Sequence, residues 1–179
     1  MIVLGIETTC DETSVSIVEK KKDDEFGKIV SEQTLSQIIK HKKFGGVVPE
    51  LASREHSKNI DYLVKKTIKN SKIEIAEVDA FAASTGPGLL GALLVGTNYS
   101  KALAIASKKP FVSVNHLQAH VLVSRMNKKI NFPFLCLLVS GGHSQIILAQ
   151  DSKKFKVIGE SLDDAVGEVF DKTSKALGL

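Results

Sequence analysis

Apolar and polar residues follow one another in a pattern typical of a mixed α/β protein. Short apolar runs predict strands, and longer segments with an apolar position every three or four residues predict helices. The first part predicts strands over 2–7, 14–19 and 28–33, a helix over 50–70, a strand over 78–84, a helix over 89–107, a strand over 111–115 and a helix over 116–126. This βββαβαβα order describes a mixed sheet flanked by helices.

The pattern restarts near residue 132. The apolar runs at 134–140 and 145–150 predict a hairpin, 156–159 predicts a third strand, and 163–177 predicts a helix. The second part therefore opens in the same order as the first and stops after its first helix. We expect a first lobe over 1–131 and the N-terminal part of a second lobe over 132–179.

Composition and charge narrow the class of protein. The chain has 179 residues, of which 43% are hydrophobic and 25% charged, and its net charge is +4. This balance permits a nucleic-acid partner without requiring one. Two cysteines and a start without a basic segment favour a cytoplasmic protein. The uncharged run 80–100 is broken by Gly86-Pro87-Gly88, so we expect no membrane span.

Two turns stand at matching places of the two lobes, over 8–13 and 140–144. Both are rich in hydroxyl or glycine residues. Their backbone N–H groups could cradle a phosphate, which would place a nucleotide between two lobes; alternatively they are ordinary hairpin turns. A third segment, 84–91, joins a strand to a helix through several glycines. It lacks the Gly-Lys-Ser/Thr of a Walker loop and is either a ligand contact or a tight turn with close helix packing.

His116 and His120 are spaced i, i+4, which on a helix puts both imidazoles on one face within reach of a single metal ion. Two partly exposed histidines are the alternative. The metalloprotease motif is excluded, because Leu117 stands where its glutamate must be. A complete site needs a further ligand, from His143 or from a carboxylate.

Four acidic residues occur along the last predicted helix: Asp163, Asp164, Glu168 and Asp171. The last three share one helical face. They form either a solvated acidic surface or a carboxylate contact for ribose hydroxyls or an ammonium group.

Six sequence strings occur in one order along the whole chain. They are GIETTCDETS (5–14), GGVVPELASREH (45–56), TGPGL (85–89), NHLQAH (115–120), LVSGGH (138–143) and DDAVGEVFDK (163–172). Together they closely resemble the tRNA adenosine threonylcarbamoyltransferase family, called TsaD in bacteria.

The resemblance implies an actin-like, ribonuclease-H-like (ASKHA) fold and an acyltransferase activity. The family transfers a threonylcarbamoyl group from threonylcarbamoyl-AMP to the exocyclic amine of the adenosine beside the anticodon, in tRNAs reading codons that begin with A. It implies a divalent iron or zinc ion on His116 and His120, and the partners tRNA, a TsaB-type paralogue and an ATPase subunit, with a homodimer as a further expectation. It assigns no catalytic residue. The implied contacts to the activated substrate are Leu138, Val139, Ser140, Gly141, Gly142 and Asp171.

Two departures from the family pattern matter. Gln118 and Ala119 replace the usual Glu-Gly between the metal histidines. Family members also continue well beyond residue 179, where they carry another glycine-rich loop, a nucleotide-binding Asn and an Asp that is the third metal ligand. We therefore expect a chain truncated after the first half, with an incomplete metal site and no activity by itself.

Two other functions are compatible with this fold. One is a non-catalytic scaffold subunit of the same modification complex, against which the intact His116 and His120 pair argues. The other is a sugar or acid kinase of the same fold, against which the full set of strings argues.

Overall fold

The computed structural model describes residues 1–24, 26–126 and 129–179. The chain divides into two compact units, Met1–His116 and Leu117–Leu179. Each unit is built around its own sheet and its own cluster of buried apolar side chains. The two units are therefore described one at a time.

The first unit contains a five-stranded sheet in the order β3-β2-β1-β4-β5. β1, β2 and β3 form an antiparallel meander, and β4 and β5 run parallel to β1. The central strand β1 is flanked on both sides, with Gly5 opposite Ser16 of β2 and Ala82 of β4. The strands are β1 (Ile2–Glu7), β2 (Glu12–Glu19), β3 (Lys28–Ser36), β4 (Ala80–Gly86) and β5 (Phe111–Asn115).

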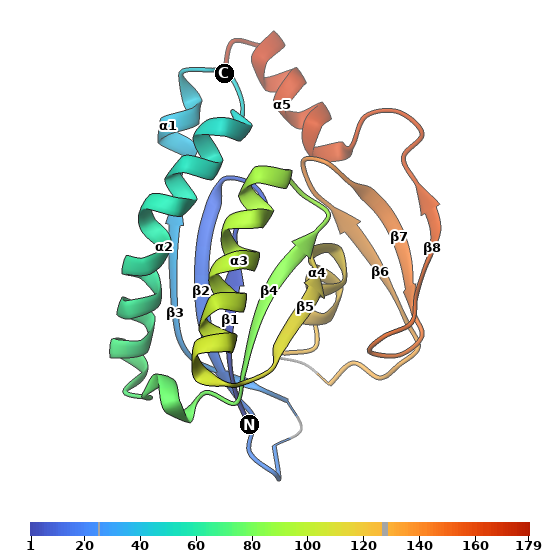
Figure 1. The fold of residues 1–179 in the computed structure, drawn as a ribbon. Coiled ribbons are helices and arrows are strands. Elements are labelled where there is room, and N and C mark those ends of the chain that lie inside the picture. The colour runs from blue at the N-terminus through green and yellow to red at the C-terminus, as the bar shows by residue number, and fades with distance from the viewer. Residues whose placement is uncertain (25, 127–128) are drawn as a thin grey trace. The chain divides into compact units, whose positions relative to one another are not determined.

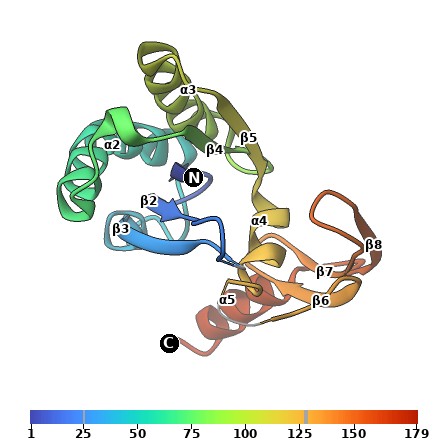
Figure 2. The ribbon, with the colours of Figure 1, turned by 90° about the horizontal axis from the view of Figure 1, so that it is seen from below.

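Two long helices cover one face of this sheet (Figures 1 and 2). Helix α2 (Pro49–Ser71) packs on β2 and β3, and α3 (Leu90–Ser107) packs on β4 and β1. Pro49 suits the first turn of α2, where its missing N–H would have no helical partner. The core between helices and sheet includes Leu4, Leu63 and Phe81, all less than 4% exposed.

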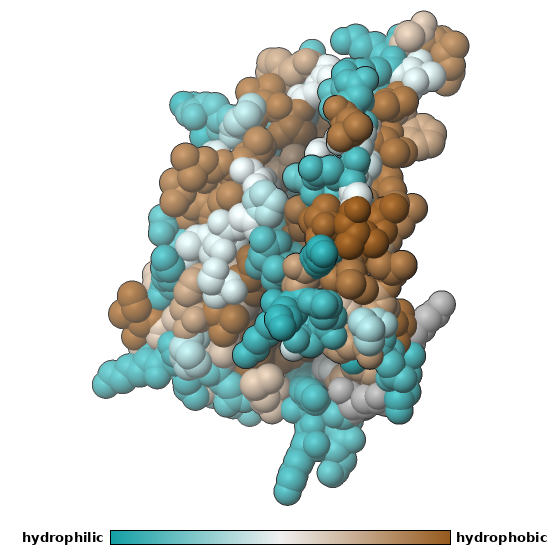
Figure 3. Space-filling view, turned by 90° about the vertical axis from the view of Figure 1, so that its right-hand side faces the viewer, coloured by the Kyte–Doolittle hydropathy of each residue, from teal (hydrophilic) through white to brown (hydrophobic). Residues whose placement is uncertain are grey.

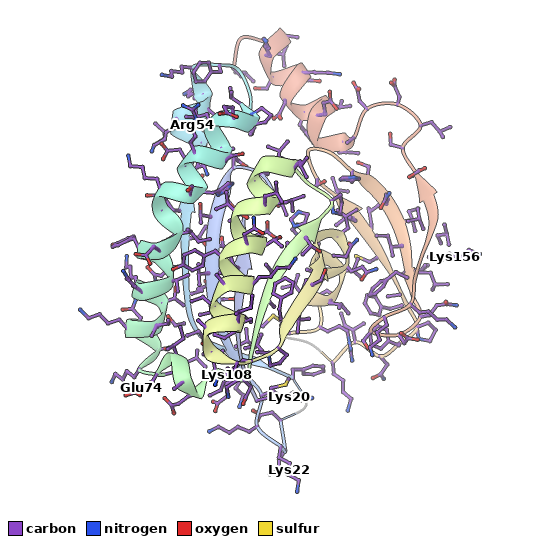
Figure 4. The ribbon with its side chains drawn as sticks, in the orientation of Figure 1. Lys20, Lys22, Arg54, Glu74, Lys108 and Lys156 are labelled. Atoms are coloured by element: carbon purple, nitrogen blue, oxygen red, sulfur yellow. The ribbon has the colours of Figure 1, made fainter. Side chains whose placement is uncertain are left out.

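Two short helical segments complete the first unit: α1 (Ile38–Lys42) and the 3₁₀ turn η1 (Ile75–Glu77). Charged side chains surround its elements. Lys22 and Lys108, both labelled in Figure 4, are exposed and extend away from the ribbon.

The second unit holds an antiparallel sheet in the order β6-β7-β8. Val121 of α4 joins Leu138, Ile147 and Ala149 in the apolar cluster of this unit. Alternate residues of β6 point to the other face, where Leu135 and Leu137 are 63% and 71% exposed. Apolar side chains also remain at the surface in the view of Figure 3. The elements are α4 (His116–Val123), β6 (Phe134–Val139), β7 (Ser144–Ala149), β8 (Phe155–Glu160) and α5 (Val166–Ala176).

Most predicted elements are present. The bounds of β5 agree fully, and those of α2 and α3 agree within one residue. The short segments α1 and η1 were not predicted. The last helix begins at Val166 rather than at residue 163, so Asp163 and Asp164 precede it. No helix in the described part of the chain is long and apolar enough to cross a bilayer. The lobe boundary after residue 131 remains a proposal.

A threonine hydroxyl joins β1 to α3. Thr8 Oγ1 donates to the carbonyl of Ala92 at 2.8 Å and accepts from the N–H of Gly96 at 3.1 Å. These two backbone groups are four residues apart, so an α-helix normally pairs them with each other. The hydroxyl can approach because residue 96 has no side chain: a Cβ there would lie 2.4 Å from Thr8 Oγ1.

We expect Gly96→Ala to destabilise the protein, although alanine is the better helix former by about 1 kcal/mol. The added methyl group would push Thr8 out of α3, at a cost of roughly 1–3 kcal/mol as for other overpacked sites. Urea unfolding measures the change. Gly46→Ala is the control, because a Cβ there meets nothing within 4 Å. A Gly96→Ala protein as stable as the parent would contradict this packing.

Candidate functional site

Glu7 ends β1 and faces the loop over residues 8–11. Its Oε1 accepts the backbone N–H of Thr9 at 2.5 Å, and its Oε2 lies 3.1 Å from Nδ1 of His116. A carboxylate only accepts hydrogen bonds, so Nδ1 carries the proton in this pair. Glu7 thereby connects the loop after β1 to the first residue of α4.

The charge of Glu7 is set by these contacts. Burial raises the pKa of its carboxyl, but hydrogen bonds from His116, Ser84 and Thr9 outweigh burial and lower the pKa to about 2. Glu7 is therefore ionised at neutral pH. It places a fixed negative charge beside the loop.

The glycine-rich segment before α3 packs against the same loop. The N–H of Leu89 donates to the carbonyl of Thr9 at 2.9 Å. Gly88 has a φ of +155°, and a Cβ there would lie 2.9 Å from both Cβ and O of Thr9. Of the two interpretations of segment 84–91, the structure shows close packing; Gly88 is required by its contact with Thr9.

The two histidines of the predicted metal pair are the first and fifth residues of α4, one helical turn apart. His116 Nδ1 lies 3.4 Å from Thr9 Oγ1 in addition to its contact with Glu7. A metal-binding histidine commonly donates its second ring nitrogen to a carboxylate in this way. Among the residues that the structure describes, however, no three His, Cys, Asp or Glu side chains converge on one point.

The matching turn of the second unit is closed by Ser140. Its N–H and its hydroxyl both contact the carbonyl of His143, at 2.8 and 3.2 Å, and its Oγ accepts the N–H of His143 at 3.0 Å. Space beside Gly141 and Gly142 is open, since a Cβ on either would meet nothing within 4 Å. The backbone of these two glycines is therefore accessible to a ligand.

The first turn of α5 presses on this Ser140 turn. The N–H of Gly167 donates to Ser140 O at 3.2 Å, and a Cβ on Gly167 would lie 2.6 Å from that oxygen. Asp171 follows four residues later, so it lies on the same face of α5 one turn further on. Helix α5 contacts the Ser140 turn at Gly167 and carries Asp171 one turn further along.

The other predicted substrate contacts differ in their surroundings. The side chain of Leu138 is buried in the core of the second unit, whereas that of Val139 is 47% exposed. A contact from Leu138 would therefore be made by its backbone. A shallow, mostly polar pocket begins beside the open glycines. It is lined by Gly142, His143, Ser144, Gln145, Glu160, Ser161, Asp163 and Ala165.

The predicted acidic face of the last helix is only partly formed. Asp164 lies before the helix, yet Lys172 Nζ reaches its carboxylate at 2.7 Å and that of Glu168 at 3.0 Å. Both carboxylates are thus ion-paired with Lys172.

Sequence reasoning gave no role to Glu7 or Gly96. Glu7 could have been suspected, because it is an acid at the end of an apolar strand directly before a polar turn. Gly96 carried no local signal. Its role depends on Thr8, which is 88 residues away in the sequence.

Two solved structures share the fold at low sequence identity. YeaZ from Pseudomonas aeruginosa matches 89% of this chain and 65% of its own, with a TM-score of 0.55 and 13% identity. Component A of (R)-2-hydroxyglutaryl-CoA dehydratase from Acidaminococcus fermentans matches 100% of this chain and 55% of its own, with a TM-score of 0.54 and 14% identity. These likenesses confirm the expected ASKHA fold.

Sequence comparison gives the family. The model of TsaD, tRNA N6-adenosine threonylcarbamoyltransferase, matches residues 28–179. The tRNA N6-adenosine threonylcarbamoyltransferase of Brucella anthropi is 50% identical over 179 residues, which are 100% of this chain and 50% of that protein. The chain thus spans about half the length of the curated relatives it matches. On this evidence the chain belongs to the TsaD family of tRNA N6-adenosine threonylcarbamoyltransferases.

Proposed function

We propose that this chain contributes the nucleotide-facing half of a tRNA threonylcarbamoyltransferase. The reaction joins the threonylcarbamoyl group of threonylcarbamoyl-AMP to the exocyclic amine of the adenosine beside the anticodon, in tRNAs reading codons that begin with A. AMP leaves with the electron pair of the cleaved anhydride bond, and the amine loses a proton. The observation that carries the proposal is the 50% identity to a named relative over the whole chain.

The two turns supply the binding surface in this proposal. The open backbone of Gly141 and Gly142 is suited to a phosphate, and Asp171 is suited to accept hydrogen bonds from ribose hydroxyls. Ser140 holds its turn closed, while Leu138 and Val139 contribute through the end of β6. Binding of this kind favours transfer by positioning the anhydride and excluding water, which supplies roughly 7–11 kcal/mol in well-aligned reactions.

We further propose that His116 and His120 hold one divalent iron or zinc ion. Support comes from their spacing on α4 and from the Glu7 contact, which would keep the proton of His116 on Nδ1 and direct Nε2 to the metal. When bound, such an ion supplies Lewis acidity or a template for the substrate. Two imidazoles hold zinc more weakly than the three or four ligands of a complete site.

Metal analysis tests this site. We expect the purified chain to retain substoichiometric iron or zinc, and the double variant His116→Ala, His120→Ala to lose it. Gln118→Ala is the matched control, because it changes the same helix without removing an imidazole. Equal metal content in the parent and the double variant would contradict the assignment.

The proposed partners are tRNA, a TsaB-type paralogue and an ATPase subunit, in the cytoplasm. Exposed apolar residues along α3 provide a surface for the paralogue or for a second copy of this chain. They recur at helical spacing and include Leu90, Leu94 and Ile105, which are 74%, 48% and 79% exposed. Leu63 of α2 is not part of this surface, because it is buried in the core.

Sedimentation tests this surface. We expect Leu94→Glu to weaken self-association, or association with a TsaB-type paralogue, at least about tenfold, because a charge would be buried at the contact. Ile39→Glu on α1 is the control, since Ile39 is 88% exposed and lies outside α2 and α3. Unchanged association of a folded Leu94→Glu protein would place the contact elsewhere.

The activity itself is tested with labelled threonine and unmodified tRNA. The reaction contains the enzyme that forms threonylcarbamoyl-AMP, a TsaB-type paralogue and an ATPase subunit. We expect no incorporation with residues 1–179 alone, and incorporation when the C-terminal half of the Brucella anthropi relative is added as a separate chain. The half-site would lack much of the positioning that a complete site supplies.

Two controls make the result decisive. The full-length relative shows that the assay works, and Lys22→Ala, at an exposed position beyond the far end of β2 from the loop over 8–11, should match the parent. Turnover by residues 1–179 alone would show that the second half is dispensable. Failure of the two halves, together with turnover by the relative, would contradict the proposed function.

A further inference from the structure

Three buried polar side chains from α1, its N-cap residue and α2 lie next to the loop after β1. Gln37, His41 and His56 are 1%, 3% and 0% exposed. His56 belongs to the string over 45–56 that carries part of the family resemblance, and the proposed function gives none of the three a task. Buried polar groups require hydrogen-bond partners, so their partners show what these side chains do.

Backbone groups stand at both ends of a chain of hydrogen bonds through these residues. At one end the N–H of Val48, directly before α2, lies 3.2 Å from His41 Nδ1. At the other end the carbonyl of Cys10 lies 3.0 Å from His56 Nε2. A backbone N–H can only donate and a carbonyl can only accept, so the two ends fix the direction of the whole chain.

The intermediate contacts agree with this direction. Because His41 Nδ1 accepts, His41 Nε2 carries the proton and donates to Gln37 Oε1 at 3.1 Å. The amide is thereby oriented, and Gln37 Nε2 donates to His56 Nδ1 at 3.2 Å. His56 Nε2 then carries its proton to the carbonyl of Cys10. Each ring has one tautomer, with the proton on Nε2.

A neutral His56 satisfies every partner around it. The hydroxyl of Thr13 is a second donor to Nδ1, at 2.7 Å. A protonated Nδ1 would oppose the amide of Gln37. Burial lowers the pKa of the His56 imidazole, which agrees with the neutral ring although Cys10 O, Glu7 and Asp11 act in the opposite direction.

The chain of hydrogen bonds ends on the loop over residues 8–11. In addition to the bond from His56 to Cys10 O, the backbone N–H of Gln37 donates to Asp11 O at 2.9 Å. The opposite side of the loop is held by α3, through Thr8 Oγ1 and through the carbonyl of Thr9. Every residue of the loop is therefore anchored, Cys10 by His56 of α2 and Asp11 by Gln37 before α1.

We propose that Gln37, His41 and His56 form a directed hydrogen-bond relay that positions the Cys10 and Asp11 peptides of the loop for its ligand. The three are positioning residues, because they reach the site only through the backbone of the loop. The identity of the ligand as the activated nucleotide rests on the proposed function; the relay does not.

Histidine tautomers test the relay directly. Long-range ¹H–¹⁵N NMR of the intact chain at pH 7 distinguishes Nε2–H, Nδ1–H and cationic rings. We expect His41 and His56 both to be neutral with the proton on Nε2, assigned with His41→Gln and His56→Gln. A cationic ring or an Nδ1–H tautomer at either residue would overturn the relay.

The Cys10 thiol reports on the loop. Burial and the neighbouring Asp11 raise the pKa of this thiol from 9.0 to about 11. Releasing the loop should return the thiol toward its ordinary pKa, with an upper limit of about 100-fold more thiolate. We expect His56→Phe to speed alkylation of Cys10 by iodoacetamide at least about fivefold. Cys136 of the second unit serves as the internal reference by peptide mass spectrometry.

Two variants separate positioning from stability. His56→Gln retains an N–H for the carbonyl of Cys10 and should restore the parent alkylation rate within about twofold. Thr67→Val removes an equally buried polar group of α2, whose hydroxyl bonds Leu63 O at 2.8 Å, remote from the loop. An equal effect of Thr67→Val, or no effect of His56→Phe, would overturn the proposal. If His56→Phe does not fold, the histidine tautomers and the alkylation rate of His56→Gln still test the relay.

AMP binding, followed by NMR titration, tests the function apart from the relay. We expect the parent to bind AMP, His56→Phe to bind it at least about tenfold more weakly, and His56→Gln to bind like the parent. The parent chain could show the expected tautomers and alkylation rates and still not bind AMP. That result would refute the nucleotide role of the loop, but the relay would stand. AMP binding unaffected by His56→Phe would refute the link between the relay and the ligand.

Discussion

The hydroxyl of Thr8 bonds two backbone groups inside α3, and the position of the loop after β1 depends on this contact. It brings the end of β1 against the helix at Gly96, and it sets where the loop over residues 8–11 begins. Helix α3 then holds the next residue through Leu89 N and the carbonyl of Thr9. The same short loop therefore fixes the start of α3, the path of β1 and the position of Glu7.

Burial of polar groups on the other side of the loop makes its position specific. A neutral hydrogen bond contributes only about 0.5–1.5 kcal/mol to stability, whereas an unsatisfied buried partner costs about 1–3 kcal/mol. Gln37, His41 and His56 are buried, so water cannot replace their partners. A loop displaced by one residue would leave several of these groups unpaired, so the network disfavours alternatives more than it stabilises the native state.

The sequence was informative where the determinants are local. Apolar periodicity located α2 and α3 within one residue, because both helices bury a long face on the sheet. It missed the first residues of β2, since Glu12 and Thr13 are held by pairing with Ser36 and Leu35 of β3. The start of α5 was also displaced, because Gly167 must lie directly on Ser140 and no capping residue marks the boundary.

In the candidate site, too, only the features that lie within one short segment were predictable from the sequence. The polar turns and the spacing of His116 and His120 are visible in one segment each. The Glu7–His116 contact joins residues 109 positions apart, and the contact between Gln37 and His56 joins an inter-element residue to a helix. No periodicity encodes such pairs. The Glu7–His116 contact follows from the order of strands in the sheet, which places β4 next to β1 and β5 next to β4.

The two turns differ in how they are held, and this difference bears on the proposed reaction. The loop over 8–11 is anchored from two sides, by α3 and by His56 of α2 together with Gln37. The turn at Ser140 is closed by its own hydrogen bonds and lies against Gly167 of α5, while a side chain on Gly141 or Gly142 would meet open space. A rigid loop loses little entropy when a ligand binds, whereas an open glycine backbone must be ordered by the ligand or by further protein. The loop over 8–11 is thus preorganised within its own unit, whereas the Ser140 turn of the second unit keeps more conformational freedom.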